Sequence, residues 1–407
     1  MSDNTAVFPY QSPPAWEQRK LGEVARRVTR KNENGDSDLP LTISAQYGLV
    51  DQRTFFNSQV ASKDMSGYFL LHRGEFAYNK STSTDSPWGA IKRLEKYDMG
   101  CVSTLYICFE LLSGDPDFLV TYYETDRWYK SVQLIAAEGA RNHGLLNIAP
   151  DDFFETQICI PKRIDEQRRI GAFFDRLDSL ITLHQRKYDK LTKVKKAMLK
   201  KMFPQNGANK PEIRFRGFTD GWEHCKLNSI ADVRDGTHAS PQYFSSGHPF
   251  ITSKNVKDGY INYDDVQYIS DEDYEEINKR SKVDVNDILM GMIGTIGNLA
   301  LIREEPDFAI KNVALIKDTG DIFYLYLYHY LQSETVLNQL LENMDGGTQK
   351  FVALKRIREL NIAFPIKSEQ QAIGTYFHNL DSVITLHQRK CDKYKSIKAG
   401  LIRKLFP

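Results

Sequence analysis

The sequence predicts an α+β fold: two mixed α/β domains separated by two long helices that form an antiparallel coiled coil, with a pseudo-two-fold internal repeat. Three observations predict it: an eleven-residue motif that occurs twice, an apolar seam around each copy, and short strand-like runs before each copy. The chain has 407 residues, 41% of them hydrophobic, which is enough for two or more packed cores.

The internal repeat is the strongest signal. Residues 177–187 read LDSLITLHQRK and residues 380–390 read LDSVITLHQRK, so ten of eleven positions match at an offset of 203. Glu-Gln at 166–167 and 369–370, and Phe-Pro at 203–204 and 406–407, repeat at the same offset. A match of this length indicates duplication.

The repeat also divides the chain. Trp16-Glu17 with Lys20-Leu21 matches Trp222-Glu223 with Lys226-Leu227, and a stretch rich in Asn, Gly and Pro joins the halves. We therefore predict a flexible tail (1–15), a first variable domain (16–160), a central helix (161–204), a linker (205–221), a second variable domain (222–364) and a C-terminal helix (365–407).

Each repeated segment is predicted to be one long helix, because apolar residues recur at alternating steps of three and four without an internal proline. The two seams consist of Phe174, Leu177, Ile181, His184, Tyr188 and Leu191, and of Phe377, Leu380, Ile384, His387, Cys391 and Tyr394. The histidines and the lysines at 195 and 398 interrupt both seams. We interpret His184 and His387 as polar residues that set the register. If the helices pair antiparallel, the C-terminus returns to the first domain, and a two-fold axis relates the halves.

The variable domains combine short β-branched or aromatic runs with turns. The runs are Phe76–Tyr78, Val102–Phe109, Ile288–Ile293 and Leu299–Ile302, and the stretch Ile322–Leu341 reads as helical.

The chain resembles the specificity subunits of type I restriction-modification enzymes. The resemblance rests on the Trp-Glu-x-x-Lys-Leu openings, the Glu-Gln-x-x-Ile helix starts, the repeated helices, and the stretches LTISAQYGLV, GEFAYNKS, DGTHASP and GTIGN. It implies that each variable domain is a target recognition domain that reads one half of a bipartite, asymmetric DNA site. It also implies that the helices set the spacer between the half-sites and dock two methyltransferase subunits, which restriction (motor) subunits join.

The resemblance implies a non-catalytic subunit without a cofactor of its own, in a complex whose other subunits use S-adenosylmethionine, ATP and magnesium. The residues agree: Gly291, Gly294 and Gly297 lack a phosphate-binding pattern, and the five scattered cysteines form no CxxC pair, so we expect no metal site. No apolar run suits a membrane span and the N-terminus lacks a signal pattern, so we expect a cytoplasmic protein. A self-contained methyltransferase or nuclease, and a scaffold without a nucleic-acid role, are the competing hypotheses.

Base reading requires directional donors and acceptors, such as Arg or Lys for guanine and Asn or Gln for adenine. Candidates in the first domain are Gln46, Tyr47, Tyr78, Asn79, Lys80, Arg141, Asn142 and His143. Candidates in the second domain are Arg234, Thr237, His238, Ser253, Lys254, Asn255, Thr348, Gln349 and Lys350.

Charge is distributed unevenly along the chain. The net charge is +1, but residues 161–203 hold 13 Lys or Arg against 5 Asp or Glu, and residues 365–407 hold 8 against 3. These basic helices could face the DNA backbone of the spacer or acidic surfaces on partner subunits, and the sequence leaves both open.

Overall fold

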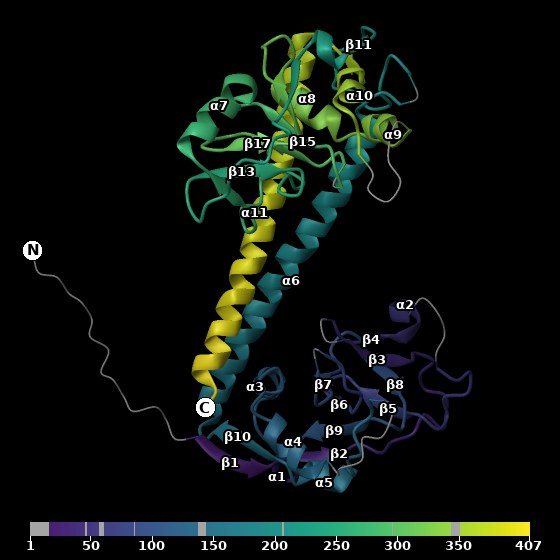
Figure 1. Ribbon diagram of the computed structural model, residues 1–407. Coiled ribbons are helices and arrows are strands. Elements are labelled where there is room, and N and C mark those ends of the chain that lie inside the picture. The colour runs from purple at the N-terminus through teal and green to yellow at the C-terminus, as the bar shows by residue number, and fades with distance from the viewer. Residues whose placement is uncertain are drawn as a thin grey trace, which may run out of the picture. The chain divides into compact units, whose positions relative to one another are not determined.

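The computed structural model describes residues 16–44, 47–56, 61–84, 86–136, 144–205, 207–294, 296–342 and 351–407. The chain forms two compact units, Met1–Leu183 with Lys390–Pro407, and His184–Arg389. Each unit combines one β-rich domain with part of each long helix (Figure 1). The predicted α+β fold with antiparallel long helices is confirmed.

The domain of the first unit is built around a four-stranded antiparallel sheet in the order β2-β9-β6-β7. Its strands are β1 (Trp16–Lys20), β2 (Ala25–Arg27), β3 (Leu41–Ser44), β4 (Gly48–Asp51), β5 (Phe69–His72), β6 (Phe76–Asn79), β7 (Ala90–Arg93), β8 (Met99–Val102), β9 (Ile107–Leu111) and β10 (Gln157–Pro161). Its short helices are α1 (Leu21–Val24), α2 (Gln52–Phe56), α3 (Pro116–Tyr122), α4 (Tyr129–Ile135) and α5 (Pro150–Phe154).

The domain of the second unit has the corresponding sheet in the order β12-β18-β15-β16. Its strands are β11 (Glu223–Lys226), β12 (Asp232–Asp235), β13 (His248–Thr252), β14 (Gln267–Ile269), β15 (Ile288–Gly291), β16 (Leu299–Leu301), β17 (Ala309–Lys311), β18 (Val313–Lys317) and β19 (Asn361–Phe364). Its helices are the 3-10 turn η1 (Leu227–Ser229), α7 (Asp271–Ser281), α8 (Tyr324–Leu331), α9 (Glu334–Glu342) and α10 (Leu354–Arg358).

The two domains follow one plan. In each, the first and last strands pair antiparallel (β1 with β10, β11 with β19), and the last strand leads into a long helix. In each, the four-stranded sheet places the strand before α3 or α8 beside a central hairpin, β6–β7 or β15–β16. The duplication read from the helices therefore extends through both domains.

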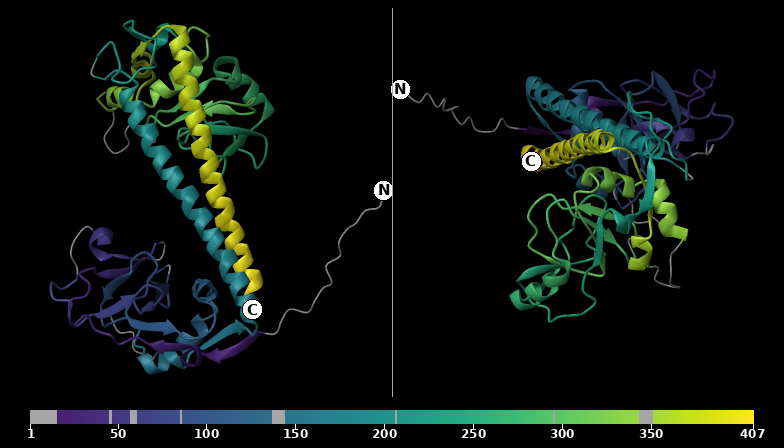
Figure 2. Two further views of the ribbon diagram at one scale, coloured as in Figure 1. Left: turned by 180° about the vertical axis from the view of Figure 1, so that it is seen from behind. Right: turned by 90° about the horizontal axis from the view of Figure 1, so that it is seen from above.

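The two long helices are α6 (Ile164–Lys201) and α11 (Lys367–Leu405), and they run side by side in opposite directions (Figures 1 and 2). All twelve predicted seam residues are buried or half-buried. The ring nitrogens Nδ1 of His184 and His387 lie 2.8 Å apart, so equivalent residues of the repeat face each other. One imidazole donates and the other accepts in such a contact.

The repeated Glu-Gln motif attaches each helix start to its domain. Gln167 Nε2 donates to the carbonyl of Pro161 (2.8 Å), and its Oε1 accepts from the backbone N–H of Asp115 (2.9 Å). Gln370 makes the same pair of bonds, to Pro365 (2.8 Å) and Phe323 (2.9 Å). These bonds satisfy backbone groups at the entrance to α3 and α8, which explains why the motif repeats.

The repeated Phe-Pro motif places an aromatic ring in each core. Phe406 packs against Trp16 and Phe118, with ring centroids 5.5 and 5.7 Å away. Phe203 packs against Tyr330 and Phe377 at 5.3 and 5.6 Å. The C-terminus therefore lies in the first unit, as the antiparallel prediction requires.

Two sequence-predicted elements are divided in the structure. The run Val102–Phe109 is interrupted because Tyr106 donates its N–H to the carbonyl of Ser103 in a turn, so β8 ends and β9 begins within it. The stretch Ile322–Leu341 is two helices, because the buried Ser333 starts α9 and its carbonyl accepts from Leu337. Apolar periodicity does not reveal such breaks.

Candidate functional site

Polar residues converge on Asn312 in the second domain. Asn312 links β17 to β18 with a φ of 53°, a left-handed conformation that Asn tolerates better than most residues. Its Oδ1 lies 2.6 Å from Nδ1 of His238, and its carbonyl accepts from Ser253 Oγ at 2.6 Å. Its backbone N–H donates to the carbonyl of Thr237 at 3.3 Å. Three predicted residues therefore meet at a fourth that the sequence analysis did not select.

The imidazole of His238 is fixed but accessible. Its Nε2 lies 3.0 Å from Oδ2 of the buried Asp235, which also pairs with Arg280, while 65% of the His238 side chain is exposed. The turn beneath it is tight, since a Cβ on Gly236 would lie 2.3 Å from the carbonyl oxygen of Ile310. Both ring nitrogens therefore have partners within the domain, so His238 would have to exchange one of these contacts to hydrogen-bond a ligand.

The same strand end is used in both domains. Just after β6, Ser81 forms a β-bridge with Leu145, and just after β15, Ile293 forms one with Phe351. Each bridge joins the central hairpin to the residues that follow segment 137–143 or 343–350. The candidates Asn79 and Lys80 lie at this junction in the first domain, and Lys80 Nζ donates to the carbonyl of Ile148 at 3.2 Å.

The comparisons with known proteins agree with this architecture. Residues 219–395 match the family described as type I restriction modification DNA specificity domain. The chain is 22% identical over 319 residues to the type I restriction enzyme MjaVIII specificity subunit of Methanocaldococcus jannaschii, across 75% of this chain and 73% of that protein. Through residues 219–395 the chain carries the DNA specificity domain of type I restriction-modification specificity subunits.

Two further relatives support this assignment. The type I restriction enzyme EcoBI specificity subunit of Escherichia coli is 26% identical over 160 residues, which cover 38% of this chain and 34% of that protein. The crystal structure of the type I restriction-modification S subunit from M. genitalium aligns with a TM-score of 0.59 and 15% identity, covering 98% of both chains. That structure supports the fold.

Within this specificity subunit, three predicted base-reading residues have structural roles instead. Tyr78 is fully buried, donates its hydroxyl to the carbonyl of Trp88 (2.8 Å), and has a pKa raised by burial. Asn255 is 3% exposed and caps a turn by accepting from the N–H of Thr252 (3.0 Å). Ser253 is 5% exposed, and its hydroxyl holds Asn312. The sequence identifies polar side chains, but it does not reveal which of them are buried and hydrogen-bonded within the fold.

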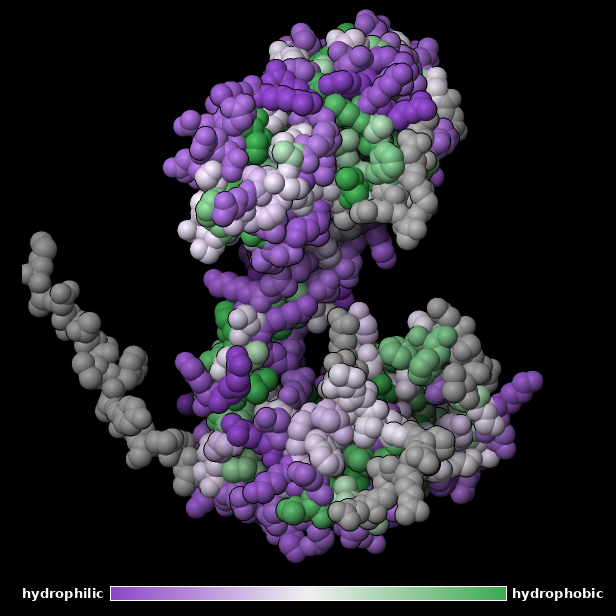
Figure 3. Space-filling view, in the orientation of Figure 1, coloured by the Kyte–Doolittle hydropathy of each residue, from purple (hydrophilic) through white to green (hydrophobic). Residues whose placement is uncertain are grey.

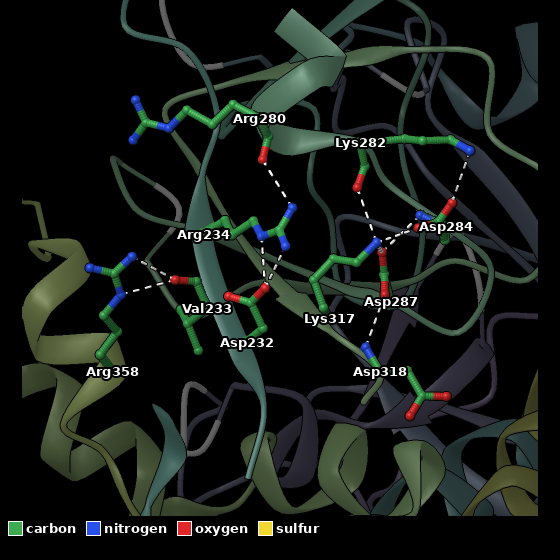
Figure 4. Close-up of polar contacts among 10 residues, drawn as sticks. All are labelled: Asp232, Val233, Arg234, Arg280, Lys282, Asp284, Asp287, Lys317, Asp318 and Arg358. Carbon is green, nitrogen blue, oxygen red and sulfur yellow. Dashed lines mark hydrogen bonds and ion pairs between the residues drawn. The ribbon is translucent and has the colours of Figure 1, made fainter. Parts of the chain in front are cut away.

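Arg234 is held by its own domain (Figure 4). Its Nε donates to Asp232 Oδ2 at 2.8 Å and its Nη1 to the carbonyl of Arg280 at 3.2 Å. Nearby, Arg358 donates twice to the carbonyl of Val233, at 2.9 and 2.7 Å. Arg234, like His238, would have to exchange contacts within the domain to read a base.

The remaining candidates are exposed or lie outside the described residues. Tyr47 is 55% exposed, with Lys96 Nζ 5.6 Å from its ring centroid, and Lys254 pairs with Asp265 at the surface (2.8 Å). Hydrogen bonding to Lys254 lowers the pKa of Asp265. The candidates outside the described residues are Gln46, Arg141, Asn142, His143, Thr348, Gln349 and Lys350.

Exposed aromatic side chains are the second feature that the sequence analysis missed. Phe55 and Phe56 on α2 are 47% and 48% exposed, and Tyr260 and Tyr263 after β13 are 58% and 50% exposed. Phe55 and Phe56 follow β4, and Tyr260 and Tyr263 lie between β13 and β14. The only sequence signal was a cluster of aromatics beside turn residues.

The described residues contain no group of three or more His, Cys, Asp or Glu side chains arranged to hold a metal ion. All five cysteines are free thiols. Among the helices in the described parts of the chain, none is long and apolar enough to cross a membrane.

Proposed function

We propose that the chain reads a bipartite, asymmetric DNA site, with each domain reading one half. The observation that carries this proposal is the shared plan of the two domains, in which different polar side chains lie at or beside the same strand end. In domain 1 the junction holds Asn79 and Lys80, and in domain 2 it lies beside the cluster of Asn312, His238 and Thr237. Similar frames with different donors and acceptors would read different bases.

Two kinds of residue would contact the DNA. Base edges would be read by exposed polar residues, foremost His238 with Asn312, together with Lys254 and the candidates on segments 137–143 and 343–350. The exposed aromatics at 55–56 and at 260 and 263 offer faces on which bases or sugars could stack.

The helix pair would dock two methyltransferase subunits. Exposed apolar side chains occur on its outer surface at Phe173 and Leu183 of α6, and at Val383 and Leu386 of α11. Leu183 and Leu386 are equivalent in the repeat, so one surface would be presented twice. The visible helix surface is otherwise largely hydrophilic, with hydrophobic patches interrupting it (Figure 3). The length of the same helices would set the spacer between the half-sites.

Catalysis would reside in the partners. Methyltransferase subunits would supply S-adenosylmethionine chemistry, and restriction (motor) subunits would add ATP- and magnesium-dependent chemistry, in a complex that works in the cytoplasm. This chain would hold no cofactor and contribute only recognition.

Sequencing of methylated genomic DNA tests the proposal. Co-expression with the methyltransferase subunit in a methylation-free host should produce methylated adenines at a two-part site with an unread spacer. A continuous palindromic site, or methylation without sequence preference, would contradict it. Methyl transfer by the purified chain alone would favour a self-contained enzyme. If the chain together with its methyltransferase subunit did not bind DNA, the scaffold hypothesis would be favoured.

A further inference from the structure

A lysine interrupts the apolar seam of each long helix at equivalent positions, Lys195 in α6 and Lys398 in α11. The two side chains are 18% and 15% exposed. An ammonium group removed from water to this degree destabilises the fold unless charges or hydrogen bonds compensate. A lysine retained in both copies of such a seam therefore requires partners.

In the first unit, Lys398 joins three elements. Its Nζ lies 2.5 Å from Oδ1 of Asp178 on α6 and 2.6 Å from Oε2 of Glu124, which lies between α3 and α4 of the recognition domain. Burial alone would lower the pKa of Lys398, but the charges of Glu124 and Asp178 outweigh burial and raise it. The ammonium group therefore stays charged and holds both carboxylates.

In the second unit, Lys195 joins the equivalent three elements. Its Nζ lies 2.7 Å from Oδ1 of Asp381 on α11 and donates to Oε1 of Gln332 at 2.8 Å. Gln332 directly follows α8 of the second recognition domain. Asp178 and Asp381 are themselves equivalent at the offset of 203. Only the partner in the recognition domain differs.

The lysine contacts give each domain a second point of attachment to its helices. The first point is the glutamine at the helix start, Gln167 or Gln370. Asp178 and Asp381 each lie eleven residues further along, which is about three turns or roughly 16 Å of helix. The apolar contacts of the helices with each domain can slide, whereas directional polar contacts at two points with this separation restrict the angle of the domain.

We infer that Lys398 and Lys195 are positioning residues that fix the tilt of recognition domains 1 and 2, respectively, on the helix pair. The inference rests on the proposed function, since tilt matters because hydrogen bonds to base edges tolerate displacements of only about 0.5 Å. Each lysine therefore sharpens discrimination at one half-site without touching DNA. Two separate contacts are involved: the helix–helix contact to Asp178 or Asp381, and the helix–domain contact to Glu124 or Gln332.

The experiment uses the full chain assembled with its methyltransferase subunit. Methylation rates are measured on the cognate duplex and on duplexes with one base pair changed in either half-site. The variants Lys398→Met and Glu124→Ala test domain 1, and Lys195→Met and Gln332→Ala test domain 2. The exposed lysines of the same helices, in Lys404→Met and Lys196→Met, serve as matched controls.

Lys398→Met and Glu124→Ala should lower discrimination roughly tenfold at the half-site read by domain 1 and leave the other half-site unchanged. Lys195→Met and Gln332→Ala should do the reverse, and the controls should match the wild type. Glu124→Ala removes the helix–domain contact but keeps the ion pair of Lys398 with Asp178, so it tests the inference even if Lys398→Met fails to fold. Equal losses at both half-sites, or unchanged discrimination in the folded variants, would overturn the inference. A wild-type complex without a bipartite preference would instead refute the proposed function.

Discussion

The two lysine sites of the helix pair differ in charge although their helices are nearly identical. Lys398 lies between two carboxylates, Asp178 and Glu124, and Lys92 approaches Glu124 to 3.5 Å. Lys195 has one carboxylate, Asp381, and the neutral amide of Gln332.

A buried histidine adds to this difference in the second unit. His329 is 1% exposed, its two ring nitrogens have no hydrogen-bond partner among the described residues, and its Nδ1 lies 3.9 Å from Asp381 Oδ2. Burial, with Lys195 nearby, lowers the pKa of His329 well below its usual value, so the ring is neutral. The comparison teaches that the helices preserve a lysine–aspartate pair, while each recognition domain supplies its own partner.

Removal of the lysines should have the largest effect. Lys398→Met leaves two carboxylates near each other with only Lys92 beside Glu124, and we expect the free energy of unfolding to fall by about 2 kcal/mol, moderated by this lysine and by their partial exposure. Lys195→Met leaves one carboxylate and should cost about half as much. Urea denaturation of both variants, with Lys404→Met as control, measures the difference. A larger loss for Lys195→Met would show that charge does not distinguish the two sites.

The glycines at the helix starts provide the next comparison. A Cβ at Gly171 would lie 2.5 Å from the backbone nitrogen of Phe118, and one at Gly374 would lie 2.8 Å from that of Tyr326. We expect Gly171→Ala to lower the free energy of unfolding by about 1 to 2 kcal/mol, and Gly374→Ala to lower it by less. The neighbouring backbone must move in both variants, but it must move further in Gly171→Ala. Gly400→Ala has open space and should instead stabilise by about 0.5 to 1 kcal/mol. Thermal unfolding of the three variants measures these changes in stability. If all three variants were stabilised equally, the close approach of the backbone would not explain Gly171 and Gly374.

The histidine pair tests whether the centre of the seam needs polar groups. Either single change, His184→Leu or His387→Leu, removes the contact between the two rings and should lower the free energy of unfolding by about 1 kcal/mol. The double change should cost less than the sum of the two, because the ring–ring contact can be lost only once. A double-mutant cycle from denaturation curves measures this coupling. Strictly additive losses would mean that the two rings do not stabilise each other.

The smallest expected effect concerns pH. Burial raises the pKa of Asp178, and Lys398 only partly opposes this. Because the folded pKa lies above the unfolded one, acidification through the folded pKa favours the folded wild-type chain, and this contribution is absent at neutral pH. The stability of the wild type relative to Asp178→Asn should therefore rise slightly as the pH falls from 7 through the folded pKa of Asp178. The unfolding midpoints of the wild type and of Asp178→Asn, measured at several pH values, provide the test. A stability difference that falls on acidification would contradict the prediction.

The sequence predicted the helices better than the recognition residues, for physical reasons. A repeated seam indicates two long helices that can pair with each other, but the direction stayed conditional and the register open, so the contact of His184 with His387 comes from the structure. The roles of Lys195 and Lys398 do not follow from the seam, because Glu124 and Gln332 lie in the variable domains with no shared pattern.

The base-reading candidates show the same limit. Tyr78 and Asn255 were reasonable choices by residue type, but both side chains are buried and form hydrogen bonds within their own domains. Asn312 was missed because its importance arises from a left-handed link between two strands, which brings Thr237 and His238 to one place. Tertiary contacts of this kind have no periodic signal.

The central claim is that two domains with one plan read two different half-sites independently. Its most direct test replaces residues 16–160 with the equivalent domain of another specificity subunit, keeps both helices, and maps the methylated sites in genomic DNA. We predict that one half of the recognised site changes while the other half and the spacer stay the same. A change in both halves, or an unchanged site in an active complex, would contradict the account.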